Sequence, residues 1–401
     1  MKIDLKSYPL MGDEITRSLF RVFEEVGILA RFVGGCVRDA VLGIAAHDID
    51  IAVPLPPDDV TQILSKADIK VIPTGYDFGT ITAVMEGRPF QITSLRQDWE
   101  TDGRRARVIY GKDWKEDALR RDFTINSLYA DRDGAVLDYF GGLEDLQAGI
   151  IRFVGNPVER IQEDYLRILR YFRFLAWYGH GAVSLEAIEA CTSLCHGLKG
   201  LSRERIGHEF LKLLSAPQPL PSLKFMNQSG IIPFILPHAM NLQALEALLN
   251  FGEKTTVLCR LAALSLPQID DTELAKALRL SRDQKQYLYD CAHRLEDYPS
   301  SERTIYRNLY QDGVDFFKDL TMLSLALRPL SSTPSILQEA FKIAASWKAP
   351  TFPLKGKDLV DMGIKTGPEL GELLKRCEAW WIDQGFQPNR EACLAWVGGI
   401  D

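Results

Sequence analysis

The sequence predicts an α+β protein, with a mixed head over about the first 145 residues and an all-helical remainder. Up to about residue 145, short apolar segments with a two-residue period alternate with helical segments. Beyond residue 155, nearly every segment has helical periodicity, with Pro or Gly at the breaks. Because 401 residues are too many for one ordinary hydrophobic core, we expect two or more domains.

The predicted elements of the head follow one another closely. An amphipathic helix is expected over residues 13–28, a strand over 31–33, and a helix near 36–42 after Gly34-Gly35. The next predicted elements are a strand over 48–53, a helix to about 66 with Asp58 or Asp59 as its candidate N-cap, and strands near 79–85 and 89–95 joined by a hairpin at Glu86-Gly87-Arg88.

Helical periodicity dominates after residue 155. The segments that show it are 157–177, 203–214, 240–250, 272–280, 283–295 and 335–347. No run of eighteen apolar residues occurs, so no membrane span is expected. The N-terminus lacks the apolar core of a signal peptide and the seven cysteines include no CxxC pair, so we expect a reduced, cytoplasmic protein. We interpret Cys191, Cys195 and His196 as ordinary helix residues, because no second pair of zinc ligands is near.

The segment HDIDIAV, residues 47–53, places two carboxylates on one face of a predicted strand. Asp is disfavoured in strands, and Asp48 and Asp50 repel each other, so a cation must compensate them. That cation is either Arg38, in a salt bridge, or a divalent metal. Gly34-Gly35 before a helix lets the backbone approach a phosphate, and Arg38 would add a charge-assisted contact. This combination favours Mg²⁺, held by Asp48 and Asp50 together with a substrate phosphate.

A second cluster lies in EDALRRDFTINSLYAD, residues 116–131. One interpretation is a solvated ion pair of Arg120 and Arg121 with Asp122 at the start of a helix. The other gives Arg121 to a triphosphate and Asp122 to a sugar hydroxyl, with Asn126 holding the loops of the pocket together. The formal net charge of −7 argues against a protein that coats nucleic acid non-specifically, but a local basic groove is compatible with it.

A third cluster lies in ERIQEDYLRILRYFRF, residues 159–174. Acidic and basic residues recur every three positions and wind slowly across one side of a predicted helix. They are Asp164, Arg167, Arg170 and Arg173. Much of the rest is apolar, so the helix should be largely buried, and three buried arginines need partners or a ligand. Because the segment has too few acids to neutralise them, a bound polyanion is favoured over a row of salt bridges.

Together these segments resemble the class II tRNA nucleotidyltransferases, the CCA-adding enzymes, and the related bacterial poly(A) polymerases. The resemblance is close over residues 31–175, continues at 201–214, weakens through the helical body and returns at 354–374. The implied domains are a polymerase-beta-like nucleotidyltransferase head with a small mixed sheet (1–145), a helical neck that recognises the base (146–215), a helical body (216–348) and a helical tail that binds tRNA (349–401).

The resemblance implies template-independent addition of CCA to the 3′ acceptor end of tRNA from CTP and ATP, with release of pyrophosphate (EC 2.7.7 class). It implies that Asp48 and Asp50 are catalytic ligands of Mg²⁺. The implied nucleotide-binding residues are Gly35, Arg38, Arg121, Asp122, Asp164, Arg167, Arg170 and Arg173. We expect no membrane partner and no obligate protein partner.

The chemistry of two implied residues supports this choice of bases. A carboxylate only accepts hydrogen bonds and a guanidinium only donates them. Cytosine and adenine both offer an amino donor beside a ring-nitrogen acceptor, which suits Asp164 and Arg167, whereas guanine and uracil offer the reverse. Each mismatch costs roughly 1–3 kcal/mol, so the pair can select C and A without a template, although it cannot set their order. With Mg²⁺ on Asp48 and Asp50, the RNA 3′-hydroxyl would attack the α-phosphorus and pyrophosphate would leave.

One position departs from the pattern. The wider superfamily often has a third carboxylate on a neighbouring strand, where this chain has Gln91. Either two carboxylates suffice, which we expect because every other motif is intact, or the protein is impaired. The segment 96–108, with Arg104, Arg105 and Arg107, resembles the flexible loop of enzymes that add the terminal A; the alternative is a plain surface loop.

Three alternatives remain at this point. The nearest is a poly(A) polymerase or a partial enzyme that adds only CC or only A. A catalytically inactive RNA-binding protein is suggested by Gln91. A nucleotidyltransferase acting on a small molecule is disfavoured, because such a substrate needs little of the long helical remainder. The sequence leaves open the oligomeric state and the residues that grip tRNA.

Overall fold

A small mixed sheet forms the centre of the head. The computed structural model describes residues 1–46, 48–101, 106–236, 238, 240–252, 254–266, 271–295, 302–327 and 334–399. Within these residues, seven strands pair in the order β3-β4-β5-β2-β1-β8-β9. They are β1 (Arg31–Val33), β2 (Asp50–Val53), β3 (Lys70–Ile72), β4 (Thr80–Met85), β5 (Arg88–Ser94), β8 (Tyr129–Ala130) and β9 (Val136–Leu137). β2 and β5 are parallel, and the other neighbours are antiparallel.

Strand β2 occupies an inner position of the sheet because its residues are apolar on both faces. Ile51, Ala52 and Val53 are fully buried, as expected for a strand covered on both sides. The strand begins at Asp50, so the prediction that Asp48 also lies on it is wrong. Asp48 comes just before the strand, consistent with the low tendency of Asp to join a ladder.

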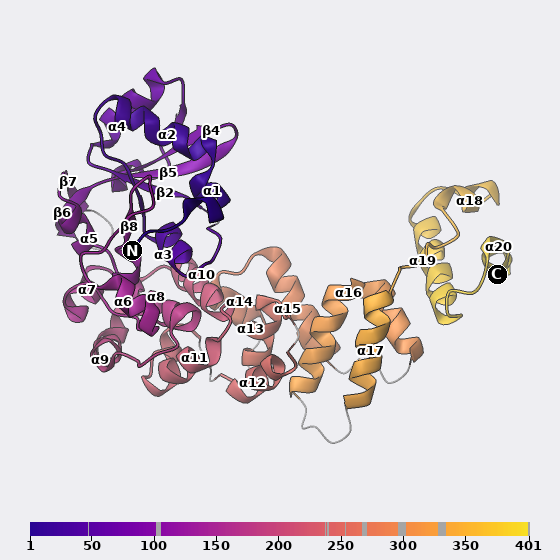
Figure 1. Cartoon of the computed structure of the whole chain (residues 1–401). Helices are drawn as coiled ribbons and strands as arrows, with labels where there is room; N and C mark the ends of the chain where they lie inside the picture. Colours follow the sequence, from indigo (N-terminus) through magenta and orange to yellow (C-terminus); the bar gives the residue numbers. More distant parts are fainter. Residues whose placement is uncertain are drawn as a thin grey trace. The chain divides into compact units, whose positions relative to one another are not determined.

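Helices of the head lie around its strands (Figure 1). They are α1 (Pro9–Gly12), α2 (Glu14–Glu25), α3 (Gly35–Val41), α4 (Pro57–Lys66), α5 (Trp114–Leu119) and α6 (Gly142–Ala148). Helix α4 begins at Pro57, whose fixed φ suits the first helical position, so neither Asp58 nor Asp59 is the predicted N-cap. Both aspartates lie in the first turn, where negative charge is favourable.

Of two hairpins in the head, the first was predicted from the sequence and the second was not. Glu86 and Gly87 join β4 to β5 with positive φ values of 49° and 79°, as a two-residue hairpin turn requires. The segment 96–108, expected to be a loop, instead contributes, within its described residues, the strand β6 (Arg96–Thr101) and the start of the antiparallel strand β7 (Ala106–Tyr110). Arg104 and Arg105 lie outside the described residues, as does the side chain of Arg107.

The chain becomes helical after the head, as predicted, but the helix predicted over 157–177 is broken. The helices of this part are α7 (Pro157–Glu163), α8 (Leu166–Tyr178), α9 (Leu185–Leu194), α10 (Arg203–Leu214) and α11 (Pro219–Gln228). Between α7 and α8, Asp164 is extended (φ −154°, ψ 104°), and its Oδ1 accepts a hydrogen bond from the N–H of Leu166 at 3.1 Å. A short acidic side chain can compete in this way for backbone N–H groups. Asp164 therefore lies in the break, and only Arg167, Arg170 and Arg173 share α8.

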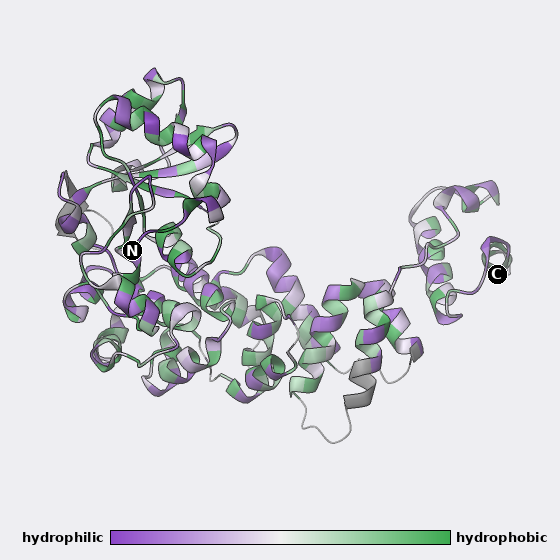
Figure 2. Cartoon of the chain, viewed as in Figure 1, coloured by the Kyte–Doolittle hydropathy of each residue, from purple (hydrophilic) through white to green (hydrophobic). Residues whose placement is uncertain are grey.

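The described chain divides into two units, residues 1–237 with 277–279 and residues 238–276 with 280–401. The remaining helices are α12 (Leu242–Asn250), α13 (Val257–Ser265), α14 (Asp271–Leu278), α15 (Arg282–Arg294), α16 (Glu302–Leu327), α17 (Pro334–Ser346), α18 (Gly356–Asp361), α19 (Pro368–Asp383) and α20 (Arg390–Gly398). Hydrophobic and hydrophilic residues alternate along them (Figure 2). None of the described helices has the length and apolar character that a membrane crossing needs. The bounds of the four predicted domains stay a prediction.

The close packing around Gly142, the first residue of α6, can be tested by substitution. A Cβ atom built on Gly142 would lie 2.2 Å from the carbonyl oxygen of Thr124, the first residue of the short 3-10 helix η3 (Thr124–Asn126). Because that neighbour is backbone, we expect Gly142→Ala to lower the free energy of unfolding by about 1–3 kcal/mol, measured by urea titration. The control is Gly371→Ala in α19, where an added Cβ would meet no described atom within 4 Å other than its chain neighbours and the helix's own backbone, and the change should be neutral or stabilising. An unchanged midpoint for Gly142→Ala would contradict the close packing.

Candidate active site

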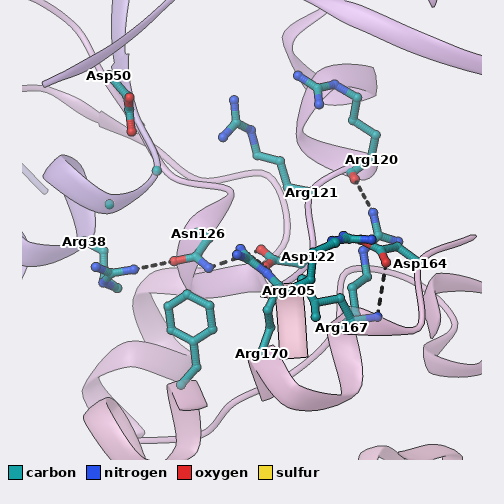
Figure 3. A pocket seen from close by; sticks show the side chains of 14 residues that line it. Arg38, Asp50, Arg120, Arg121, Asp122, Asn126, Asp164, Arg167, Arg170 and Arg205 are labelled. Carbon is teal, nitrogen blue, oxygen red and sulfur yellow. Dashed lines mark hydrogen bonds and ion pairs between the residues drawn. The ribbon is translucent and has the colours of Figure 1, made fainter. Parts of the chain in front are cut away.

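An arginine-rich cavity of about 480 Å³ lies in the first unit. It is bordered by the turn from β1 to α3, by β2, by the residues after α5, by α8 and by one residue of α10 (Figure 3). The described residues that line it are Gly34, Gly35, Arg38, Asp50, Arg120, Arg121, Asp122, Asn126, Asp164, Leu166, Arg167, Arg170, Phe174 and Arg205. Six of these are arginines and three are aspartates, so positive charge prevails and the cavity suits a polyanion.

Asp50 lines the cavity, whereas Asp48 is exposed and is not among its lining residues. Within the described residues, neither carboxylate forms an ion pair or accepts a side-chain hydrogen bond. The alternative of a salt bridge from Arg38 is not realised, because Arg38 pairs with Asp39 at 2.7 Å. Burial raises the pKa of Asp50, the charge of Arg121 opposes this rise, and the charge of Asp48 adds to it.

This pair of carboxylates fits a divalent cation. The charge of Asp48 acts on Asp50, and among the described residues no cationic side chain forms an ion pair with either carboxylate. Carboxylate oxygens are the ligands that Mg²⁺ takes, and Mg²⁺ commonly completes its shell with substrate phosphates and water. Among the described residues, no group of three or more His, Cys, Asp or Glu is placed to hold a metal ion, so substrate and water would have to supply the other ligands.

The turn between β1 and α3 brings backbone to the wall of the cavity. Gly34 has φ 69° and ψ −121°, which residues with a Cβ rarely adopt. Its N–H donates to the carbonyl oxygen of Leu128 at 2.9 Å, and its own carbonyl accepts from the N–H of Arg38 at 3.0 Å. The turn is therefore tied to the segment that precedes β8 and to the first turn of α3.

Arg38 is held from three sides although it faces the cavity. Its side chain donates to Oδ1 of Asn126 at 2.6 Å and to Oδ1 of Asp39 at 2.9 Å. Its guanidinium lies 4.3 Å from the ring centre of Tyr178, as in a cation–π contact. Only 7% of the residue is exposed, so its orientation is fixed by the protein.

Asp122 is the central acceptor of the cavity wall. Its Oδ1 accepts from the N–H of Phe123 at 2.9 Å and from Nδ2 of Asn126 at 3.1 Å, and its Oδ2 accepts two bonds from Arg170. Burial acts to raise the pKa of Asp122, but Arg170 and Asn126 outweigh it and lower that pKa to about 2. A carboxylate has roughly four acceptor sites, all of which are occupied. The predicted contact with a ribose hydroxyl would therefore require Arg170 to release one bond.

Asp164 and Arg167 both line the cavity but have separate partners. Oδ2 of Asp164 accepts from Nη2 of Arg205 at 2.7 Å. Arg167 pairs with Glu163, donates from Nη1 to the carbonyl oxygen of Arg160 at 2.7 Å, and donates from Nη2 to that of Arg120 at 3.3 Å. A guanidinium has five N–H donors, so Arg167 keeps donors for a ligand. The predicted reading of a base by this pair stays a prediction.

Arg170 and Arg173 differ in position although both lie on α8. Arg170 lines the cavity through its pairing with Asp122. Arg173 is not among the lining residues, and its Nε donates to Oε2 of Glu209 at 2.6 Å. Its predicted nucleotide contact therefore has no support from the cavity and stays a prediction.

Several residues that shape the site were missed by sequence analysis. Asp117 binds Arg120 and Arg121, Arg205 binds Asp164, and Glu209 binds Arg173. The only signal for two of them was the resemblance of residues 201–214, which gave no role to individual residues. Asn126, expected to hold the loops of the pocket together, does bridge Arg38 and Asp122.

The Asp122 contacts predict a pH-dependent stability. Its folded pKa of about 2 lies below the ordinary 3.8, so its stabilising effect is complete above about pH 5 and is lost as the pH falls toward 2. At about 1.4 kcal/mol per pKa unit, Asp122→Asn should cost roughly 2 kcal/mol of unfolding free energy between pH 5 and 8, and less below pH 4. Urea titrations at several pH values measure this cost. Asp59→Asn, an exposed carboxylate of α4, should show no such difference; a cost for Asp122→Asn that grew on acidification would refute the prediction.

Comparisons with known proteins identify one family. Residues 30–152 match the family model described as "Poly A polymerase head domain", and residues 182–242 match "Probable RNA and SrmB- binding site of polymerase A". The chain is 34% identical to CCA tRNA nucleotidyltransferase 1, mitochondrial, of Mus musculus, over 99% of this chain and 93% of the mouse protein. It is 30% identical to the CCA-adding enzyme of Ligilactobacillus salivarius, over 91% of this chain and 92% of that enzyme.

A solved structure gives the same result. The Bacillus stearothermophilus CCA-adding enzyme in complex with CTP matches with a TM-score of 0.74 and 25% identity, over 96% of both chains. The predicted α+β fold and the predicted family are thereby confirmed. On the evidence of its sequence over nearly its whole length and of its fold, the chain belongs to the CCA tRNA nucleotidyltransferases.

Proposed function

We propose that this enzyme adds CCA to the 3′ end of tRNA without a nucleic-acid template, using CTP and ATP and releasing pyrophosphate. The observation that carries the proposal is the cavity, which places Asp50 on the same surface as Asp164 and Arg167 with an excess of arginines between them. One cavity of this kind can bind the triphosphate and the base of one nucleotide together.

Enzymes of this family use divalent metal ions, and we propose Mg²⁺ held by Asp48 and Asp50. This assignment is supported by two carboxylates that form no ion pair with any residue in the described part of the chain. When bound, Mg²⁺ would neutralise phosphate charge and favour deprotonation of the RNA 3′-hydroxyl. No other residue of the described lining carries a free carboxylate, because Asp122 and Asp164 are both paired with arginines.

The arginines and the turn after β1 would bind the nucleotide. Gly35 gives the backbone close access to the cavity, and Arg38 and Arg121 present guanidinium groups that are already held in place. Arg170 is paired with Asp122. It would stabilise either the phosphate groups of the nucleotide or, through Asp122, its ribose. Guanidinium groups match phosphate oxygens in geometry and charge, and holding them in advance avoids reorganisation when the substrate binds.

Base choice is assigned to Asp164 and Arg167. Arg205 is paired with the Asp164 carboxylate, and a carboxylate can only accept hydrogen bonds. Arg167 can only donate. An amino group beside a ring nitrogen, as in cytosine and adenine, matches this order, whereas guanine and uracil would leave both groups without partners.

A second candidate function is suggested by the matching family model, whose description names poly(A) polymerase. An enzyme that adds only CC or only A is also compatible with the same cavity, because Asp164 and Arg167 accept both bases. The names of the relatives favour complete CCA addition. We propose a cytoplasmic location, supported by seven free cysteines, although the mouse relative is mitochondrial.

The activity is tested with tRNA transcripts that end before CCA, after C and after CC. Each is incubated with CTP, ATP, both, UTP or GTP, and the products are sized on a sequencing gel. We expect completion to CCA with CTP and ATP together, and incorporation of UTP or GTP at least about a hundredfold slower. Long A tails on unrelated RNA would instead establish a poly(A) polymerase, and arrest at CC or failure before CC would establish a partial enzyme.

The metal ligands are tested by Asp50→Asn, which keeps the size of the side chain and removes its charge. Incorporation of CMP into the transcript that ends before CCA should fall at least about a hundredfold, because stabilisation by a metal ion contributes several kcal/mol. The matched control is Asp59→Asn, which removes an equal charge from the surface of the head. Near-normal activity of Asp50→Asn across a Mg²⁺ titration would rule out the proposed role.

A further inference from the structure

A single buried carboxylate holds the two arginines that follow α5. Asp117, on the last turn of α5, is 1% exposed. Its Oδ1 accepts from Nε and Nη2 of Arg120 at 2.9 and 2.6 Å, and its Oδ2 accepts from Nε and Nη2 of Arg121 at 3.2 and 3.1 Å. Each oxygen therefore binds one guanidinium through two N–H groups, which fixes the plane of both guanidinium groups.

Tyr129, on strand β8 of the sheet, also forms hydrogen bonds with Asp117 and Arg121. Its hydroxyl donates to Oδ2 of Asp117 at 2.6 Å and accepts from Nε of Arg121 at 3.2 Å. Its ring is fully buried and packs edge-on against Trp114, with ring centres 5.3 Å apart. The contacts of Asp117 are thus anchored both to α5 and to β8.

The part of Arg121 that Asp117 leaves free faces the cavity. Among the described residues, Nη1 of Arg121 makes no hydrogen bond. A Cβ atom built on Gly34 would lie 3.4 Å from this Nη1, so the group lies against the turn after β1. The charge of Arg121 also acts on Asp50, and the guanidinium extends toward the side of the cavity where Asp50 lies (Figure 3).

The charges of Asp117, Arg120 and Arg121 show how the Asp117 carboxylate acts on the two arginines. Burial acts to raise the pKa of Asp117, but Arg121, Arg120 and the Tyr129 hydroxyl lower it to about 2, so it stays ionised at neutral pH. Asp117 offsets one of the two positive charges and leaves the other for a ligand. Without it, Arg120 and Arg121 would repel each other and take other rotamers.

We propose that Asp117 is a positioning residue, which directs Nη1 of Arg121 at the triphosphate beside Asp50 while it separates Arg121 from Arg120. The inference rests on the proposed function, because it assumes that Arg121 contacts the triphosphate. The competing explanation is that Asp117 serves only to stabilise the fold as a buried ion pair.

Asp145 offers a matched control in the same head. It is 3% exposed and accepts hydrogen bonds from one arginine, Arg152, and from one hydroxyl, that of Thr124, but it does not line the cavity. Asp117→Asn and Asp145→Asn each remove a charge from a buried carboxylate with arginine and hydroxyl partners. A stabilising role predicts similar effects for both, whereas a positioning role does not.

The test measures binding of CTP and of cytidine to the full chain by isothermal titration, together with the thermal midpoint. Asp117→Asn should weaken CTP binding about tenfold or more and cytidine binding by less than about threefold. Asp145→Asn should lower the midpoint and leave both affinities unchanged. Equal losses for CTP and cytidine, or unchanged CTP affinity in Asp117→Asn, would overturn the inference.

A double-mutant cycle shows whether Asp117 acts through Arg121. In an Arg121→Ala chain, Asp117→Asn should cause little further loss of CTP affinity, because residues that act as a unit are not additive. Fully additive losses would overturn the inference but leave the Arg121 contact intact. Unchanged CTP affinity in Arg121→Ala alone would instead refute the proposed Arg121 contact, and the inference with it. If Asp117→Asn does not fold, Tyr129→Phe replaces it in both tests. Tyr129→Phe should also weaken CTP binding more than cytidine binding, and the outcomes that would overturn the inference are the same.

Discussion

The site depends on buried acceptors that hold the arginines of the cavity before a substrate binds. Asp122 is the central one, because it accepts from Arg170 of α8 and from Asn126 of η3, and Asn126 in turn accepts from Arg38 of α3. This row of contacts joins three elements across one wall of the cavity (Figure 3). Removing one partner of a buried pair leaves an uncompensated charge, and the cost of roughly 2 kcal/mol expected for Asp122 is a substantial fraction of the stability of a typical domain, about 5–15 kcal/mol. Loss of Asp122 would therefore disturb the head, the η3 turn and the helix together.

The same acceptors explain how a chain with a net charge of −7 can bind a polyanion. Charges in salt solution act over about 8–10 Å, so the lining of the cavity governs the local field more than the total charge does. Asp117, Asp122 and Asp164 neutralise part of the positive charge, and the remainder faces the cavity. Groups that are already oriented toward a developing negative charge need not reorganise during the reaction, which is how protein electrostatics lower a barrier.

The sequence predicts features that depend on local periodicity and misses features that depend on distant partners. Strand β1, helix α3 and the hairpin at Glu86-Gly87 follow from apolar spacing and from glycine, and they are found where expected. The break at Asp164 was missed because apolar periodicity continues on both sides of it, whereas the backbone of Asp164 is extended and its side chain accepts from the N–H of Leu166. The arginines of α8 suggested a ligand because few acids lie beside them in sequence. Their acids come from other elements, Asp122 from the head and Glu209 from α10, and spacing along one helix cannot reveal them.

The neighbouring-strand position that often holds a third carboxylate is present here, but it is occupied by an amide. Gln91 of β5 pairs in register with Asp50 of β2, and the two strands run parallel. Two carboxylates carry a charge of −2, which one divalent cation would neutralise, and this would leave Arg121 available to a triphosphate. A third carboxylate at Gln91 would add a negative charge next to Asp50, which the nearby arginine would have to offset. The amide therefore agrees with an arrangement in which Asp48 and Asp50 serve the metal and the arginines serve the nucleotide.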